Sequence, residues 1–158
     1  MTRQLLFVCS GNTCRSPLAA ALARRLVHAH GLDVSVASAG TGAIDGSPAS
    51  DGSMVVGLER GVDLSSHRAQ FLTRELVDAA DLVLCMATQH VERVRELGSE
   101  GKAFLLTDYA AARPIGRAIN DPFGGAFEGY RRMADELERE LAGVIDRLSL
   151  EQSTRGLE

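Results

Sequence analysis

Short apolar runs typical of buried strands alternate along this chain with longer segments that have a helical pattern. The runs are QLLFVC (4–9), VSVASAG (34–40), DLVLCM (81–86) and AFLLT (103–107). Because apolar strands of this kind form parallel sheets that are covered on both sides, the runs also require helices on both faces. We therefore predict an α/β fold with a four-stranded parallel sheet and helices on both faces.

The segments between the apolar runs carry the helical signals. Leu18, Leu22 and Leu26 recur at helical spacing after Pro17, and Gly31 follows them as a stop signal. Further helices are expected over 48–60, 73–80, 88–97 and from about 126 to 148, with a loop over 108–126.

Size and charge limit the domain organisation and the partners. The length of 158 residues suits one core, so we predict a single domain over 1–150 and a loose polar tail over 151–158. The net charge of −4 and the lack of a long basic run argue against nucleic acid as the ligand. The apolar run at the N-terminus is too short to span a membrane and lacks a usual cleavage site. We therefore expect a cytoplasmic monomer with no nucleic-acid or membrane partner.

The stretch VCSGNTCRSP, residues 8–17, joins the first expected strand to the first expected helix. In parallel sheets, ligands bind at the carboxyl ends of the strands. Small residues before a helix N-terminus direct several backbone N–H groups into one concavity, which suits phosphate or a similar oxyanion. Gly11 and Asn12 tolerate left-handed backbone angles, Ser16 is placed to cap the helix, and Pro17 suits its first turn. The ATP-binding pattern G-x-x-x-x-G-K-[ST] is absent here.

Cys9 and Arg15 add chemistry to this loop. The N–H groups that bind an anion also stabilise a thiolate at Cys9. The guanidinium of Arg15 can hold two oxygens of a phosphoryl group and stabilise their charge in the transition state. A nucleophile, an anion cradle and an arginine fork together predict phosphoryl transfer to cysteine. The alternative is a core thiol beside a surface arginine, but the run C-x-G-N-x-C-R-S-P after an apolar strand is much more specific than C-x5-R.

The cysteines do not fit the other common uses of this residue. Cys9, Cys14 and Cys85 are the three cysteines of the chain, an odd number and too few for a secreted disulfide framework. Cys9 and Cys14 are not at the usual spacing of zinc ligands, and no histidine cluster lies nearby in the sequence. A reactive thiol or inert core thiols remain.

The chain resembles the low-molecular-weight protein tyrosine phosphatase family from LLFVCSGNTCRSP through SAG, DLVLCM and NDPFGG to the last helix. The resemblance implies a phosphotyrosine protein phosphatase I-like three-layer sandwich that acts on phosphorylated proteins. It implies that Cys9 attacks phosphorus to give a phosphocysteine, that Arg15 binds the phosphate, and that Asp121 of DPF is the general acid. A carboxylic acid placed over the pocket can protonate the leaving group, whereas NDPFGG alone would be only a turn.

The resemblance also implies roles for the residues around Cys9. The phosphate-binding loop would contain Ser10, Gly11, Asn12, Thr13, Cys14 and Ser16. Asn12 would hold the loop shape, with Ser38 and His67 as its braces, and Ser16 would donate to the Cys9 sulfur. Cys14 would form a reversible disulfide with Cys9 that protects it from over-oxidation. No metal or cofactor is implied, because the arginine and the N–H groups supply the charge stabilisation.

Departures from the tyrosine-specific pattern bear on the substrate. Thr13 stands where an aliphatic residue is common, and the loop TGAIDGSPAS, with Ile44, offers no aromatic wall. Gly124 follows Phe123 where a second aromatic residue is common. We therefore predict a pocket with Thr13, Ile44 and Phe123, similar to that of the bacterial protein-arginine phosphatase branch. Phosphoarginine is favoured over phosphotyrosine, which remains the alternative.

Two other classes fit less well. Thiol-dependent arsenate reductases resemble this chain in the anion loop, but they use two further cysteines after the third strand. Only Cys85 is present there, and it lies within the strand, where a core role is expected. A non-catalytic phosphate-binding module would not need Cys9, Arg15 and Asp121 together.

Overall fold

The computed structural model describes residues 2–99 and 101–156. The elements, in chain order, are β1 (Arg3–Cys9), α1 (Arg15–Ala29), β2 (Val34–Gly40), α2 (Asp51–Glu59), α3 (Arg74–Ala79), β3 (Leu82–Cys85), α4 (Thr88–Glu96), β4 (Ala103–Leu105), α5 (Leu106–Ala111) and α6 (Phe127–Arg155).

The four strands form one parallel sheet in the order β2-β1-β3-β4. Strand β1 pairs with β2 from Arg3↔Val34 to Cys9↔Gly40. Alternate residues of β1 enter two different hydrophobic clusters: Leu5 and Phe7 belong to one, and Leu6 and Val8 to the other. A strand that is buried on both faces is apolar at every position, which is why the run LLFV predicts a central strand.

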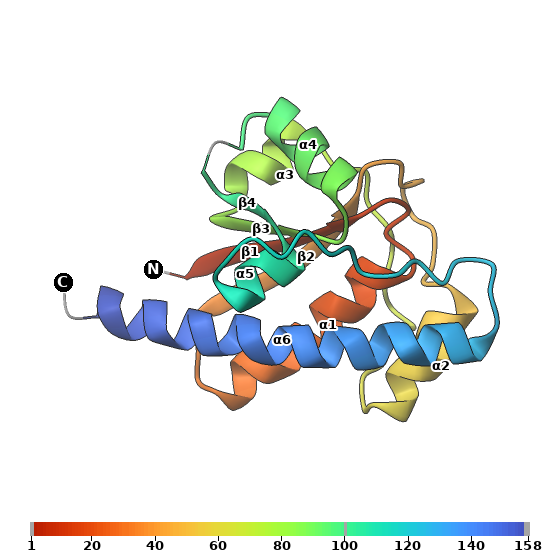
Figure 1. The fold of residues 1–158 in the computed structure, drawn as a ribbon. Coiled ribbons are helices and arrows are strands. Elements are labelled where there is room, and N and C mark those ends of the chain that lie inside the picture. The colour runs from red at the N-terminus through yellow and green to blue at the C-terminus, as the bar shows by residue number, and fades with distance from the viewer. Residues whose placement is uncertain (1, 100, 157–158) are drawn as a thin grey trace.

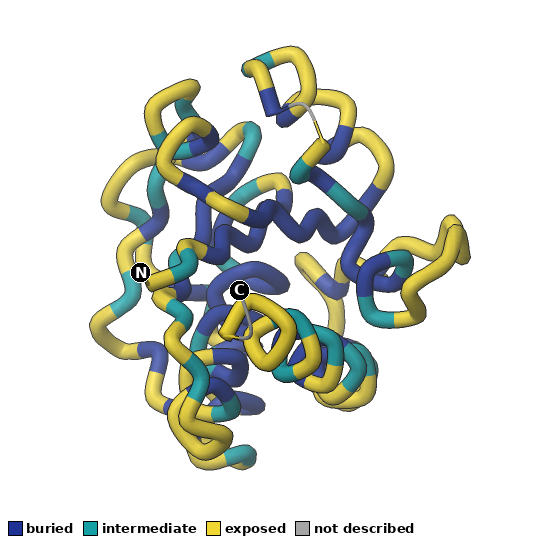
Figure 2. Tube along the Cα trace, turned by 90° about the vertical axis from the view of Figure 1, so that its left-hand side faces the viewer, coloured by how far each residue is buried: buried dark blue, intermediate teal, exposed yellow. Residues whose placement is uncertain are grey.

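Helices cover both faces of the sheet, which confirms the predicted three-layer architecture. Figure 1 shows α3 and α4 above the sheet and α1, α5 and α6 below it. The lower cluster combines Leu18 and Leu22 of α1 with Leu137 and Leu141 of α6. In Figure 2 the strands form a buried, dark-blue layer through the middle of the molecule, and exposed residues lie around the outside.

The strand order reverses next to β1, and this reversal places the candidate site. Strand β1 lies between β2 and β3, while α1 and α4, which follow β1 and β3, cover opposite faces of the sheet. The connections therefore diverge at the carboxyl ends of β1 and β3 and open a crevice there, as expected for a parallel sheet. The loop of residues 10–14 lies at this crevice.

The start of α1 differs from the prediction. The helix begins at Arg15, and its N-cap residue is Cys14, which makes no side-chain capping hydrogen bond. Ser16 therefore lies inside the first turn, so its predicted role as the cap is wrong. Its hydroxyl contacts the sulfur of Cys9 instead.

The C-terminal half also differs in two places. The predicted loop over 108–126 contains part of α5, because the fourth strand ends at Leu105 and the chain turns directly into a helix. The loose tail expected from residue 151 is wrong for residues 151–155, since α6 continues to Arg155. Glu151 accepts hydrogen bonds from Arg3 and Tyr109, which hold this end of the helix on the domain.

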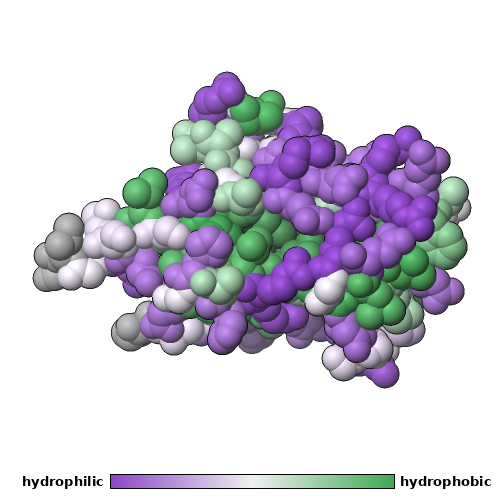
Figure 3. Space-filling model, turned by 90° about the horizontal axis from the view of Figure 1, so that it is seen from below, coloured by the Kyte–Doolittle hydropathy of each residue, from purple (hydrophilic) through white to green (hydrophobic). Residues whose placement is uncertain are grey.

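The underside of the molecule shows hydrophilic and hydrophobic side chains interspersed, with a group of hydrophobic ones at its right-hand end in Figure 3. Exposed apolar residues of α2 and α6 include Leu58 and Phe127. Within residues 2–99 and 101–156, none of the helices is long and apolar enough to cross a membrane.

Candidate active site

Asn12 is the structural centre of the loop after β1. It is fully buried and has a φ of 55°, the left-handed conformation that asparagine tolerates well. Its amide Nδ2 donates to Ser16 Oγ at 2.7 Å and to Ser38 Oγ at 2.9 Å. Its Oδ1 accepts from the backbone N–H of Gln70 at 3.0 Å. One side chain thus fastens the loop to the first helix, to β2 and to the segment before α3.

His67 supports the same residue from outside the loop. Its Nε2 lies 2.7 Å from the carbonyl oxygen of Asn12. Because a carbonyl can only accept, Nε2 carries the hydrogen and donates it. Burial lowers the pKa of His67, and the charges of Arg24 and Arg68 act in the same direction. His67 and Ser38 both contact Asn12, where the resemblance placed them.

The sulfur of Cys9 lies at the end of β1 and accepts hydrogen bonds from the loop and from the first turn of α1. The backbone N–H of Asn12 is 3.3 Å from it, and Ser16 Oγ is 2.9 Å away. Ser16 Oγ already accepts from Asn12 Nδ2, so its own proton is available to the sulfur. Both contacts stabilise a negative charge on this sulfur.

Arg15 lies over the loop and connects it to the segment that carries Asp121. Its guanidinium is buried and donates to the carbonyl oxygen of Ile119 at 3.1 Å and to Asp121 Oδ2 at 3.4 Å. Ile119 is itself buried, and its N–H donates to the carbonyl oxygen of Met86 at the end of β3. The segment with Asp121 is therefore anchored next to Cys9 through Ile119, which sequence reasoning missed.

Cys9, Arg15 and Asp121 line one cavity of about 350 Å³. Its lining consists of Cys9, Ser10, Gly11, Thr13, Cys14, Arg15, Thr41, Gly42, Asp121 and Phe123. Of the predicted pocket residues, Thr13 and Phe123 line the cavity. Ile44 is not among the lining residues and is 76% exposed, so its predicted place in the pocket is wrong.

Thr41 and Gly42 take the place expected of Ile44 because the chain after β2 runs close to the loop. The N–H groups of Thr41 and Gly42 donate to the carbonyl oxygens of Cys9 and Ser10. A Cβ atom on Gly40 would lie 2.5 Å from Ser10 O, so this approach requires glycine. The SAG run is the sequence signal for this contact.

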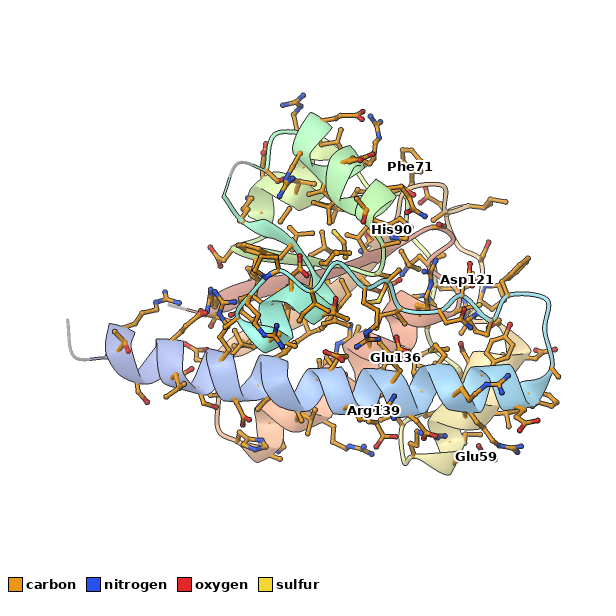
Figure 4. The ribbon with its side chains drawn as sticks, viewed as in Figure 1. Glu59, Phe71, His90, Asp121, Glu136 and Arg139 are labelled. Atoms are coloured by element: carbon orange, nitrogen blue, oxygen red, sulfur yellow. The ribbon has the colours of Figure 1, made fainter. Side chains whose placement is uncertain are left out.

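His90 is a second residue that sequence reasoning missed. It lies on α4, is fully buried, and its Nε2 is 2.9 Å from Ser10 Oγ. Burial lowers the pKa of His90 to about 4, the charge of Arg15 acts in the same direction, and Asp121 opposes it. Figure 4 shows His90 and Asp121 at the same end of the molecule. A histidine inside a helix carries no sequence signal that distinguishes this position from an exposed one.

The cysteines occupy distinct environments. All three are free thiols and buried. Cys14 Sγ contacts Ser50 Oγ at 3.2 Å and the Tyr130 hydroxyl at 3.7 Å, and its redox role stays a prediction. Burial raises the pKa of Cys85, which fits the core role expected of it and not a relay role.

The arrangement has the parts of a phosphoryl-transfer site. The cavity is lined by the Cys9 sulfur, the guanidinium of Arg15 and the carboxyl group of Asp121, which are the groups that such a site needs. Among the residues that the structure describes, no group of three or more His, Cys, Asp or Glu side chains could hold a metal ion.

Comparisons with known proteins agree with this geometry. The model of the family described as low molecular weight phosphotyrosine protein phosphatase matches residues 4–154. A protein-arginine-phosphatase of Geobacillus stearothermophilus is 40% identical over 96% of this chain and 100% of its own length. The Wzb low molecular weight protein-tyrosine-phosphatase of Escherichia coli K12 is 32% identical over 96% of this chain and 99% of its own. The structure also matches a YwlE arginine phosphatase mutant with a phosphorylated active-site serine, with a TM-score of 0.87 and 36% identity over 92% of this chain and 95% of that one.

Proposed function

The chain belongs to the low molecular weight phosphotyrosine protein phosphatase family, and on this premise we propose that it dephosphorylates proteins at phosphoarginine through a phosphocysteine at Cys9. The observation that carries the proposal is the Cys9 sulfur. It accepts hydrogen bonds from the Asn12 N–H of the loop and from the Ser16 hydroxyl of α1, and it shares a cavity with Arg15 and Asp121.

The first step forms a bond between the Cys9 sulfur and phosphorus and breaks the bond from phosphorus to the substrate nitrogen or oxygen. Arg15 binds two phosphoryl oxygens and stabilises their charge as the bond breaks. Asp121, in its acid form, gives its proton to the leaving group. In the second step a water attacks phosphorus and gives its proton to the Asp121 carboxylate, and the Cys9 thiolate leaves. Ser16 donates to that departing sulfur.

Support for phosphoarginine comes from the walls of the cavity. Phe123 is the one aromatic residue among its lining side chains, and it is 74% exposed. A phenyl ring would gain little stacking energy from such a wall. A guanidinium can instead pair with the carboxylate of Asp121. Over 96% of this chain, the identity is 40% to a protein-arginine-phosphatase and 32% to the Wzb tyrosine phosphatase, which favours the same substrate. A probable tyrosine phosphatase that is 44% identical matches only 67% of the chain.

Thr13 provides the first test of this preference. Its side chain lines the cavity, where its hydroxyl can hydrogen-bond a polar group near the scissile P–N bond. We expect Thr13→Ile to lower kcat/KM for a phosphoarginine peptide by about tenfold, the value of one hydrogen bond to a charged group, and to leave kcat/KM for a phosphotyrosine peptide unchanged or higher. Thr13→Ser is the control that keeps the hydroxyl. A wild type that strongly prefers phosphotyrosine, with no change in Thr13→Ile, would show that the substrate is phosphotyrosine.

Asp121→Asn tests the proton donor. The amide keeps the size of the carboxyl group but cannot give up a proton, so kcat/KM for a phosphoarginine peptide, which reports on the first step alone, should fall about 100-fold. The loss should be much smaller with p-nitrophenyl phosphate, because its leaving group is a weak base that needs no proton. Equal losses on both substrates would mean that Asp121 acts only through its ion pair with Arg15.

A further inference from the structure

A hydrogen-bonded pair, formed by the exposed Ser10 and the buried His90, lies at the cavity and has no part in the steps above. The two residues follow neighbouring strands: Ser10 comes directly after β1, and His90 lies in the helix after β3. We propose that His90 is a positioning residue, whose Nε2–H donates to Ser10 Oγ so that the Ser10 hydroxyl donates its own proton to a phosphoryl oxygen in the cavity. This inference rests on the proposed phosphatase function.

The hydrogen bond between His90 and Ser10 links a residue of the protein interior to a residue that lines the cavity. His90 has no exposed surface, and its Nε2 lies 2.9 Å from Ser10 Oγ. Ser10 is exposed and lines the cavity together with Cys9 and Arg15. A fully buried side chain thus controls the orientation of a hydroxyl group at the binding site.

The direction of this hydrogen bond follows from the other ring nitrogen. Nδ1 of His90 is buried and has no hydrogen-bond partner among the residues that the structure describes. If Nδ1 carried the hydrogen, a buried N–H donor would have no acceptor, which is rare and costs free energy. If Nε2 carries it, only a lone pair is unpartnered. The tautomer with its hydrogen on Nε2 is therefore favoured, and Nε2 donates to Ser10.

The charge state of His90 agrees with this tautomer. Burial and the neighbouring Arg15 both lower the pKa of His90, so the ring is neutral at neutral pH and has a single N–H. The Ser10 oxygen accepts that hydrogen, which leaves the hydroxyl proton for another acceptor. Arg15 and the backbone N–H groups of the loop can only donate, whereas a phosphoryl group bound beside them brings oxygens that accept, and the Ser10 hydroxyl can donate to one of these. A neutral His90 also adds no cation that would repel a guanidinium leaving group.

The test compares Ser10→Ala, His90→Leu and the double variant, after wild type has been shown to hydrolyse a phosphoarginine peptide. A hydrogen bond to a charged oxygen is worth about tenfold or more, so each single variant should raise the inhibition constant of inorganic phosphate by about tenfold. The inhibition constant of the double variant should exceed the larger of the two single-variant constants by no more than about twofold, because both substitutions remove the same contact. His90→Gln should restore binding, since its amide nitrogen can donate from nearly the position of Nε2.

Matched changes at His28, an exposed histidine in the last turn of α1, serve as controls and should leave both kcat/KM and phosphate inhibition unchanged. Folding of each variant is checked by thermal unfolding. Should His90→Leu fail to fold, Ser10→Ala and His90→Gln still decide the question. The inference would be overturned if Ser10→Ala had the wild-type inhibition constant for phosphate, or if the two single-variant increases multiplied in the double variant. Neither result would contradict the proposed function. A wild type without phosphatase activity would instead overturn the proposed function.

Discussion

Replacing Cys9 with serine is expected to abolish turnover, with a fall in kcat of at least roughly ten-thousand-fold, as for the loss of other enzymatic nucleophiles. The reason is chemical and local. The donors on the Cys9 sulfur, Ser16 Oγ at 2.9 Å and the Asn12 N–H at 3.3 Å, stabilise a thiolate. A serine hydroxyl is far harder to ionise, and an alkoxide is a much poorer leaving group in the second step.

The same variant should retain its fold and its affinity for inorganic phosphate, because the loop is held by Asn12, His67 and Ser38. Cys85→Ala is the matched control: Cys85 lies in β3, away from the cavity lining, and its loss should change kcat by less than about twofold if the fold is kept. Substantial turnover by Cys9→Ser would mean that another group attacks phosphorus.

Arg15→Lys is expected to lower kcat/KM by about a thousandfold, at the low end of the range for an arginine that stabilises a transferring phosphoryl group. Lysine keeps the positive charge but not the planar fork that binds two oxygens at once. The variant also loses the hydrogen bond from Arg15 to Ile119 O, which helps to place the segment with Asp121.

The control for this substitution is Arg93→Lys, an exposed arginine on α4 that pairs with Glu96, and no change in kcat/KM is expected. If Arg15→Lys kept near wild-type kcat/KM, charge alone would suffice, and a bidentate fork could not be part of the mechanism.

The sheet could be predicted because a strand that is buried on both faces has apolar residues at successive positions of the sequence. Leu5 and Leu6 belong to opposite clusters, so β1 is apolar from Leu5 to Cys9. The start of α5 could not be separated from the fourth strand, since Leu105 and Leu106 are both buried and apolar. The last turns of α6 were missed because Glu151 is held by Arg3 and Tyr109, which are distant in sequence.

The site was predictable where its residues lie in one short loop. Cys9, Arg15 and Ser16 are neighbours in sequence, and their contacts follow from a strand, a tight loop and a helix N-terminus. Ile119 and His90 carry no such signal, because their contacts to Arg15 and Ser10 arise from tertiary packing. Ile44 was misplaced because the path of the chain after Gly40 depends on backbone hydrogen bonds to the loop.

The most direct test of a phosphocysteine at Cys9 is to stop the reaction of wild type with a phosphoarginine peptide in acid within one turnover and to map the phosphorylated residue by mass spectrometry. Asp121→Asn, with its slower chemistry, is measured in parallel. We expect one phosphoryl group on the peptide that contains Cys9, and none in Cys9→Ser at the same reaction time. Turnover without a phosphorylated enzyme, or a phosphoryl group on any other residue, would contradict this expectation.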